Sequence, residues 1–193
     1  MTTTSPRIPP LPPDQWGDDV RAGIAALRPA SATQELRRSK GGPKGLNVLG
    51  TLAQHPTLMH AYHSFNGHIL YTNSLDARQR ELLVLRVAAR RGAEYEWAQH
   101  VHIARDAGLT DDEIGRIAAG EQSADWSPLD GAMLRAVDEL LADARITDGT
   151  WSDLARELDR HQLMDLVFTV GAYDLLAMAF RSFGVELDED LAP

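Results

Sequence analysis

The stretch RQRELLVLRVAARRGAEYEWAQHVHIARDAGLTDDEI, residues 78–114, contains apolar runs that glycines interrupt. Leu82, Leu85 and Ala89 recur at the three- and four-residue spacing of a helix. Glycine commonly ends helices because it adopts left-handed backbone angles at little cost. The stretch predicts a helix over 75–91 capped by Ser74 and ended by Gly92, a second over 94–107 stopped by Gly108, and a third opened by a capping box of Thr110 and Glu113 and ended near Gly120.

The rest of the chain also predicts helices rather than strands. From Leu46 onward the pattern is almost entirely helical, and no segment alternates apolar and polar residues between turns. Short connections favour antiparallel neighbours, so we expect an all-α fold that forms a single domain over 14–193. Further helices are predicted over 14–27, over 128–144 with Ser127 as cap and Pro128 in the first turn, over 150–160, and over 161–183 with Gly184 at its end.

Two segments are expected to lie outside the helices. Five of the ten prolines fall within residues 1–13, which therefore form an extended arm that either drapes over a neighbour or stays loose. Residues 37–45, RRSKGGPKG, combine basic side chains with glycines and a proline, so we expect a mobile loop. That loop is either a solvated connection or a lid that contacts an anion.

The composition excludes several classes of chemistry. The chain has no cysteine, which excludes disulfides, thiolate metal sites, cysteine nucleophiles and dithiol redox reactions. Its 28 acidic residues outweigh 19 Lys and Arg, and the net charge of -9 repels phosphate backbones. We therefore expect no nucleic-acid partner.

Neither a secretion signal nor a membrane span is predicted. The N-terminal sequence MTTTSPRIPPLPPDQW has no apolar run after a basic start. The most apolar stretch, LMDLVFTVGAYDLLAMAF at 163–180, contains Asp165 and Asp174, and two carboxylates inside a span make lipid insertion costly. We therefore expect a soluble, cytoplasmic protein with no membrane partner.

The helix predicted over 94–107 carries the main candidates for chemistry. Positions four apart share one face of a helix, so Glu96 and His100 form a stripe beside the core stripe of Trp97 and Val101. A carboxylate one turn before an imidazole can hydrogen-bond it and fix its tautomer, as a general base or acid requires. The alternative is an ordinary pair on the helix surface.

Four other side chains are candidates for substrate binding. Arg86 could hold a substrate carboxylate by a bidentate contact, although a solvated basic edge or a pair with an acidic neighbour also explains it. Tyr95 and Trp97 could wall a pocket for a flat ring, or simply pack in the core. His68 could enter such a pocket. No H-E-x-x-H pattern occurs, so we expect no metal site.

Residues 78–114 resemble the core of the carboxymuconolactone decarboxylase family, which includes the AhpD-type alkylhydroperoxidases. The AhpD pattern is a glutamate on one helix followed by Cys-x-x-Cys-x-x-x-His at the start of the next. Glu81 and His100 match the glutamate and the histidine, whereas Ala93 and Glu96 stand at the two cysteine positions. Peroxide reduction requires a thiolate and a resolving thiol, so this cysteine-less member is not expected to be a peroxidase.

The resemblance implies an AhpD-like helical bundle and an enzyme that needs no cofactor. We expect a lyase or isomerase that acts by proton transfer on a small carboxylated or lactone-type substrate. His100, held by Glu96, would carry the proton, and Glu81 would orient the imidazole or act as a second acid. The family also implies a homo-oligomer, a trimer or a hexamer. A lactone hydrolase and a non-catalytic member that binds a ligand or a partner are the alternatives.

Overall fold

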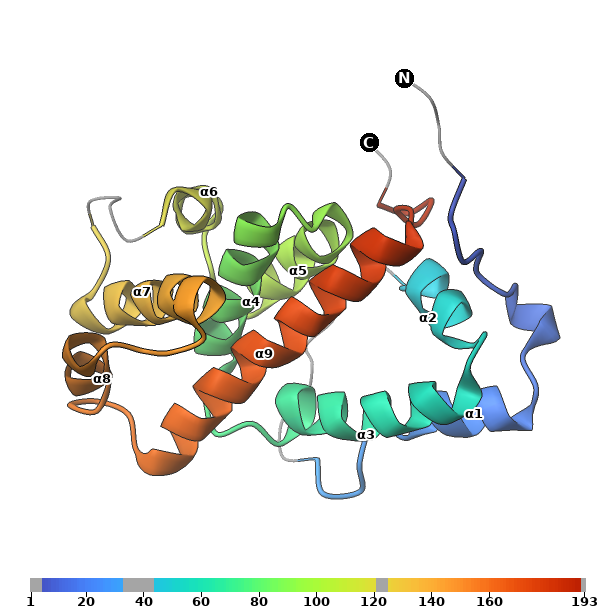
Figure 1. Ribbon diagram of the computed structural model, residues 1–193, viewed down its shortest axis with the longest axis horizontal. Helices are drawn as coiled ribbons and strands as arrows, with labels where there is room; N and C mark the ends of the chain where they lie inside the picture. Colours follow the sequence, from blue (N-terminus) through green and yellow to red (C-terminus); the bar gives the residue numbers. More distant parts are fainter. Residues whose placement is uncertain (1–4, 33–43, 121–124, 192–193) are drawn as a thin grey trace.

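The computed structural model describes residues 5–32, 44–120 and 125–191. Over these ranges the chain forms helices and no strand, so the predicted all-α class is confirmed (Figure 1). The elements are a short 3-10 helix η1 (Pro13–Gln15), followed by α1 (Asp18–Ala25), α2 (Leu46–Leu52), α3 (Pro56–Tyr71), α4 (Ala77–Arg91), α5 (Glu94–Asp106), α6 (Asp111–Ala119), α7 (Pro128–Asp143), α8 (Asp148–Leu154) and α9 (Arg160–Phe183).

Helix α4 begins later than predicted because a different residue caps it. The Asp76 side chain accepts a hydrogen bond from the Gln79 N–H, and the Gln79 side chain accepts one from the Asp76 N–H. The prediction that Ser74 is the cap is wrong, because Ser74 donates its N–H and its hydroxyl to the Asp165 carboxylate, both at 2.6 Å. Gly92 ends α4 with φ 58°, as predicted.

Two other helices have bounds that differ from the prediction. The helix predicted over 150–160 begins earlier and is shorter, because Thr147 caps α8 and the helix ends at Leu154. The helix predicted over 14–27 is too long, because η1 and Gly17 precede α1. The helix ends predicted at Thr110, Gly120, Ser127 and Gly184 are confirmed.

Helix α4 is the centre of the main core. Leu82, Leu83, Val84 and Leu85 are all fully buried, so neighbours cover this helix on every side. It contacts α5, α6, α7 and α9 (Figure 1). Full burial of one leucine side chain stabilises a fold by about 1.5–3 kcal/mol, and this run is therefore a main source of stability.

A second, smaller core joins the N-terminal helices. Val20 of α1, Ala53 after α2 and Met59 of α3 pack together, and α1 lies along α3 (Figure 1). The glycine at position 67 permits the close approach, because a Cβ atom there would lie 2.6 Å from the Leu27 carbonyl oxygen. Helix α9 contacts both α3 and α4 and so connects this core to the main one.

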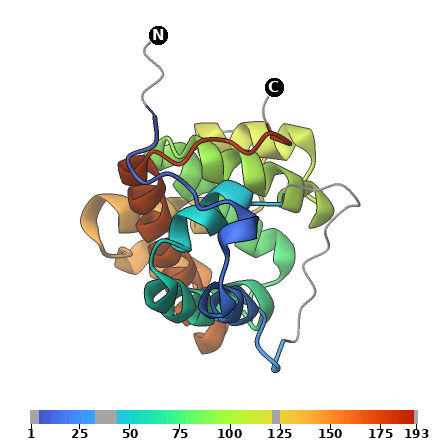
Figure 2. The same cartoon turned by 90° about the vertical axis from the view of Figure 1, so that its right-hand side faces the viewer.

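The N-terminal arm packs against its own chain over the described residues 5–12. The Arg7 N–H donates to the Phe183 carbonyl oxygen at 2.8 Å, and the Leu11 N–H donates to the Gly50 carbonyl oxygen at 2.9 Å. The arm thus runs from the end of α9 to α2 (Figure 2). This part of the arm is ordered by hydrogen bonds rather than loose.

Helix α9 is long and apolar enough to cross a membrane by length and composition alone, and 50% of its most apolar window is buried inside the fold. Other elements hold both of its carboxylates. Asp165 accepts hydrogen bonds from Ser74, and Asp174 forms an ion pair with Arg91 of α4. Helix α9 therefore contributes one face to the core, and its two carboxylates are used for tertiary contacts.

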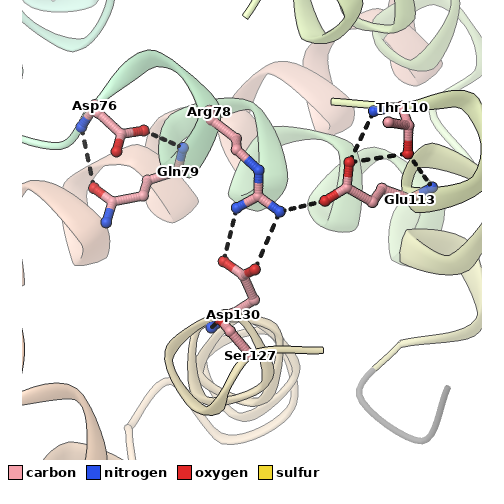
Figure 3. Close-up of polar contacts among 7 residues, drawn as sticks. All are labelled: Asp76, Arg78, Gln79, Thr110, Glu113, Ser127 and Asp130. Atoms are coloured by element: carbon pink, nitrogen blue, oxygen red, sulfur yellow. Dashed lines mark hydrogen bonds and ion pairs between the residues drawn. The ribbon is translucent and has the colours of Figure 1, made fainter. Parts of the chain in front are cut away.

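Arg78 connects the beginnings of three helices (Figure 3). It lies in the first turn of α4, and its guanidinium donates to both oxygens of Asp130 near the start of α7, at 3.0 and 3.1 Å. One nitrogen also donates to Glu113 at the start of α6, at 2.5 Å. Since bidentate charged pairs are among the stronger hydrogen bonds, this contact fixes α6 and α7 against α4.

We expect Arg78→Met to lower the free energy of unfolding by about 1–3 kcal/mol, because buried Asp130 would lose its charged donor. Urea denaturation measures the loss. Arg145→Met is a matched control, since Arg145 and its partner Asp148 are 72% and 96% exposed, and an exposed pair contributes at most about 1 kcal/mol. Equal losses in the two variants would contradict the role assigned to Arg78.

Candidate active site

A cavity of about 470 Å³ lies among α1, α2, α3, α5 and α9. Small-molecule sites commonly measure about 300–1,000 Å³, so the cavity can enclose a small substrate. Much of its wall is apolar. The polar side chains on the walls contributed by α3, α5 and α9 include Tyr62, Asn66, Glu96, His100 and Tyr173.

The basic loop predicted over 37–45 is described only at Lys44 and Gly45, and both line the cavity. The other residues of that loop lie outside the described part of the chain. Lys44 is exposed, and so is Arg28, the second cationic residue on the described wall. These positive charges therefore stand at the solvent edge of the cavity rather than in its interior.

His100 is held in place by a buried carboxylate from the neighbouring helix. Its Nδ1 lies 2.6 Å from Oε2 of Glu81, and Arg80 Nε donates to the other oxygen, Oε1, at 3.0 Å. Burial alone would raise the pKa of Glu81, but its interactions with His100, and then with Arg80, outweigh the burial and lower that pKa. Glu81 is therefore ionised, and it accepts a hydrogen bond from Nδ1–H of the imidazole.

The tautomer set by Glu81 determines what His100 offers to the cavity. When Nδ1 of a neutral imidazole carries the hydrogen, Nε2 is an acceptor with a free lone pair. No hydrogen bond to Nε2 forms within the described residues. The ring is also fixed by an edge-to-face contact with Tyr173, with centroids 4.9 Å apart. His100 is thus a positioned base on the cavity wall.

The hydrogen bond predicted between Glu96 and His100 does not form. Both carboxyl oxygens of Glu96 are buried and have no hydrogen-bond partner among the described residues. Burial, and secondly the negative charge of Asp174, raise the pKa of Glu96 well above its ordinary value, which favours the protonated carboxyl group. The prediction is wrong because Glu81, from an adjacent helix, takes the imidazole Nδ1 that Glu96 was expected to hold.

Sequence reasoning missed two cavity residues, Tyr62 and Asn66. Among the described residues, the buried side-chain atoms without a hydrogen-bond partner are the Tyr62 hydroxyl, Asn66 Oδ1, both Glu96 oxygens and Arg116 Nε, and all but the last belong to cavity residues. Buried polar atoms are normally paired, so this concentration marks a place for a polar ligand. Their spacing of four residues on α3 was the available signal.

Tyr95 lines the cavity as predicted, but its hydroxyl is already used. It donates to Asp188 Oδ2 at 2.7 Å, and Gln99 Nε2 donates to the same oxygen at 3.0 Å. The other oxygen of Asp188 accepts from the Asn47 N–H at 2.7 Å. The segment after α9 therefore joins α2 to α5 and fixes the Tyr95 ring as part of the wall.

The other three predicted binding residues do not line the cavity. The Arg86 guanidinium donates to both oxygens of Asp138 and to the Ile117 carbonyl oxygen, so it fixes α6 and α7 instead of a substrate. Trp97 packs at the edge of the core. His68 Nε2 lies 2.7 Å from Asp165 Oδ1 and helps to hold the start of α9. The expectation of a pocket role for these three residues is therefore corrected.

Part of the chain is similar in sequence to a known protein family. Residues 56–139, from α3 into α7, match the carboxymuconolactone decarboxylase family. This part of the chain is similar to that family. The resemblance predicted from residues 78–114 is thus confirmed, and Glu81, Glu96 and His100 all fall within the matched region. No curated protein matches the chain in sequence.

Solved structures show the same family fold. The debrominase Bmp8 has a TM-score of 0.74 at 12% identity, with 95% of this chain and 93% of that chain covered. A protein of unknown function from Agrobacterium tumefaciens, called a putative antioxidant defence protein AhpD, has a TM-score of 0.67 at 18% identity, covering 71% of this chain and 94% of that chain. A peroxidase-related AhpD core from Ralstonia eutropha JMP134 has a TM-score of 0.68 at 17% identity, covering 83% and 94%. The AhpD-like fold is therefore confirmed.

The two positions aligned with the AhpD cysteines have separate environments in this protein. Ala93 is buried in a small apolar cluster with Ala88 and Ala177. Glu96 lines the cavity. The first position thus contributes only packing, whereas the second contributes a neutral carboxyl group to the candidate site.

We expect Glu81→Gln to lower the free energy of unfolding at neutral pH by about 3–5 kcal/mol, because it removes the charge that Arg80 and His100 share. The folded-state pKa of Glu81 lies below its ordinary value of 4.5, so its stabilisation is present above pH 4.5 and is lost as the pH falls through the folded-state pKa. Urea denaturation of both proteins across this acidic range should show the difference shrinking. A constant difference would contradict the assignment.

Glu96→Gln should have the opposite pH dependence. The folded-state pKa of Glu96 is raised above its ordinary value of 4.5. The stability of the native protein relative to the variant is therefore highest below pH 4.5. It falls as the pH rises towards the raised pKa. Above pH 4.5 we therefore expect the variant to gain stability relative to the native protein. Denaturation curves at acidic, neutral and alkaline pH measure this. A variant that loses stability as the pH rises would show that Glu96 is ionised in the fold.

Proposed function

We propose that this protein is a cofactor-independent lyase or isomerase that moves a proton on a small lactone-type or carboxylated substrate in the cavity. The observation that carries the proposal is the contact at 2.6 Å between Glu81 and His100, which leaves Nε2 as a base on the cavity wall. Glu96 supplies a neutral acid to the same cavity. Carboxyl groups whose pKa values are moved in opposite directions are typical of acid–base sites.

The chemistry needs one proton carrier and one place for negative charge. In an isomerase, His100 Nε2 removes a proton from a carbon beside a carbonyl group, and the electron pair moves to the carbonyl oxygen. The imidazolium ion, stabilised by ionised Glu81, then returns the proton to another carbon. In a lyase, a substrate carboxylate leaves as carbon dioxide, its electron pair moves to the same oxygen, and an imidazolium ion at His100 supplies the proton.

Thiol-dependent peroxide reduction is not part of this proposal. That reaction needs a thiolate that becomes a sulfenic acid and a second thiol that forms a disulfide. The chain has no cysteine. The cavity groups of this protein handle protons, and none of them can undergo that redox cycle.

We expect His100→Gln to lower kcat by about 10²–10⁴-fold, the usual contribution of a general acid–base group. The test is NMR in D₂O with carboxylated unsaturated lactones. Deuterium uptake without release of carbon dioxide identifies an isomerase, release of carbon dioxide identifies a lyase, and a ring-opened acid identifies a hydrolase. His102→Gln is the matched control, because His102 is on the same helix but does not line the cavity. Unchanged turnover in His100→Gln would refute the role of His100. Wild-type inactivity on the whole panel would favour the ligand-binding alternative.

A further inference from the structure

Several buried polar atoms on the cavity wall have no hydrogen-bond partner among the described residues. None of them belongs to His100, the proposed proton carrier. The Tyr62 hydroxyl and both oxygens of Glu96 are buried, and neither residue has a hydrogen-bond partner for these atoms within the described residues. They come from different helices, α3 and α5, and line one cavity with His100. An unpaired buried donor costs stability, and a ligand acceptor would remove that cost.

We propose that Tyr62 and Glu96 donate two hydrogen bonds to a single oxygen of the substrate, the oxygen that becomes negatively charged when His100 moves the proton. This inference rests on the proposed function and specifies it, because it identifies the oxyanion site and the kind of group that binds there. The ligand class is a small, ring-sized ketone or lactone that presents an uncharged carbonyl group to this part of the cavity.

The protonation states of the two groups agree with a donor role. Burial raises the pKa of Tyr62, so its hydroxyl keeps its hydrogen. The raised pKa of Glu96 keeps one hydrogen on its carboxyl group. Preorganised donors aimed at a developing oxyanion commonly supply a large share of catalysis, because they need no reorganisation during the reaction.

The distribution of charge explains why the bound carbonyl should be neutral. The cationic residues on the described wall, Arg28 and Lys44, are exposed, and the guanidinium of Arg80 is engaged with Glu81. Among the described residues, a substrate carboxylate placed beside Glu96 would therefore be buried without a nearby cation, which is costly. An enolate avoids this cost, because the proton that creates it converts His100 into a cation in the same cavity. The oxyanion and its counter-charge thus arise together.

The bond changes balance without a further reactant. A C–H bond breaks, the proton joins Nε2 of His100, and the electron pair forms the enolate C=C bond while the carbonyl π pair moves to oxygen. Tyr62 and Glu96 keep their own protons and only share them in hydrogen bonds. Reprotonation at carbon restores the carbonyl group and neutral His100.

The experiment uses 4-nitrophenol, a planar ring whose hydroxyl oxygen imitates the oxygen of an enol. Its binding to the full chain is followed by titration, and its absorption reports whether phenol or phenolate is bound. We expect saturable binding that Tyr62→Phe and Glu96→Leu each weaken by about tenfold, because each variant removes one donor and so loses one strong hydrogen bond. Both variants should also reduce the bound phenolate fraction.

Thr169→Val is the matched control. It removes a buried hydroxyl that accepts a hydrogen bond from Asn73 outside the cavity, so it should leave the Kd unchanged while lowering stability. Tyr62→Phe should do the reverse and weaken binding without lowering the stability of the ligand-free protein, because the hydroxyl it removes has no hydrogen-bond partner among the described residues. A ligand role and a merely structural role of Tyr62 are separated by this comparison.

Three results would each overturn the inference. They are an unchanged Kd in both cavity variants, a loss of 4-nitrophenol affinity in Thr169→Val as large as in the cavity variants, and no saturable binding to the wild-type protein. Its failure is distinguishable from failure of the proposed function. If His100→Gln abolishes turnover while Tyr62→Phe and Glu96→Leu leave phenol binding unchanged, proton transfer stands and the oxyanion site is wrong. If phenol binding depends on Tyr62 and Glu96 but no substrate turns over, the binding site stands and the enzyme assignment is wrong.

Discussion

The row of hydrogen bonds from Arg80 through Glu81 to His100 is the interaction on which the site depends. Arg80 is 2% exposed and Glu81 is fully buried, and burying such groups is costly unless each charge has a partner. The cost is met only if α4 and α5 pack in one register, since α4 supplies the arginine and the glutamate and α5 supplies the histidine. Positioning the imidazole and positioning these two helices are therefore one physical requirement.

The same fold gives two glutamates opposite protonation states. Glu81 lies between the Arg80 guanidinium and the His100 imidazole, which favour its ionised form. Glu96 is buried without a hydrogen-bond partner among the described residues and near the negative Asp174, which favours its neutral form. The AhpD pattern has a cysteine at the position of Glu96. Replacing a thiol by a carboxyl at this position removes the means to transfer electrons and leaves a group that can donate a proton or a hydrogen bond. This change agrees with the proposed proton transfer, whereas the AhpD pattern supplies two thiols for redox chemistry.

The cavity exists because the two cores are joined at a few places rather than along their whole length. Helices α1 and α3 pack on each other through close approaches such as that at Gly67, while α9 contacts both α3 and α4. The arm contacts α2, and Asp188 holds α2 and Tyr95, so segments from both ends of the chain fix one wall. The site is therefore assembled from residues far apart in the sequence.

The sequence by itself determined the helical class, most helix ends and the family resemblance, because spacing, glycines and capping residues act within one or two turns. It also made Glu81, Glu96 and His100 the candidate site residues, since an alignment needs only order and spacing. It did not determine which glutamate binds the imidazole. The i to i+4 spacing favoured Glu96, yet Glu81, 19 residues before His100, makes the hydrogen bond.

Only the tertiary structure decided that choice, and it likewise decided that Arg86 and His68 are structural and that Tyr62 and Asn66 face the cavity. Ser74 is a further example, because its bond to Asp165 spans 91 positions and replaced the cap that local pattern predicted. The physical reason is the same in each case. A hydrogen bond or a pKa depends on which groups are adjacent in space and how far water is excluded, and a local sequence pattern contains neither.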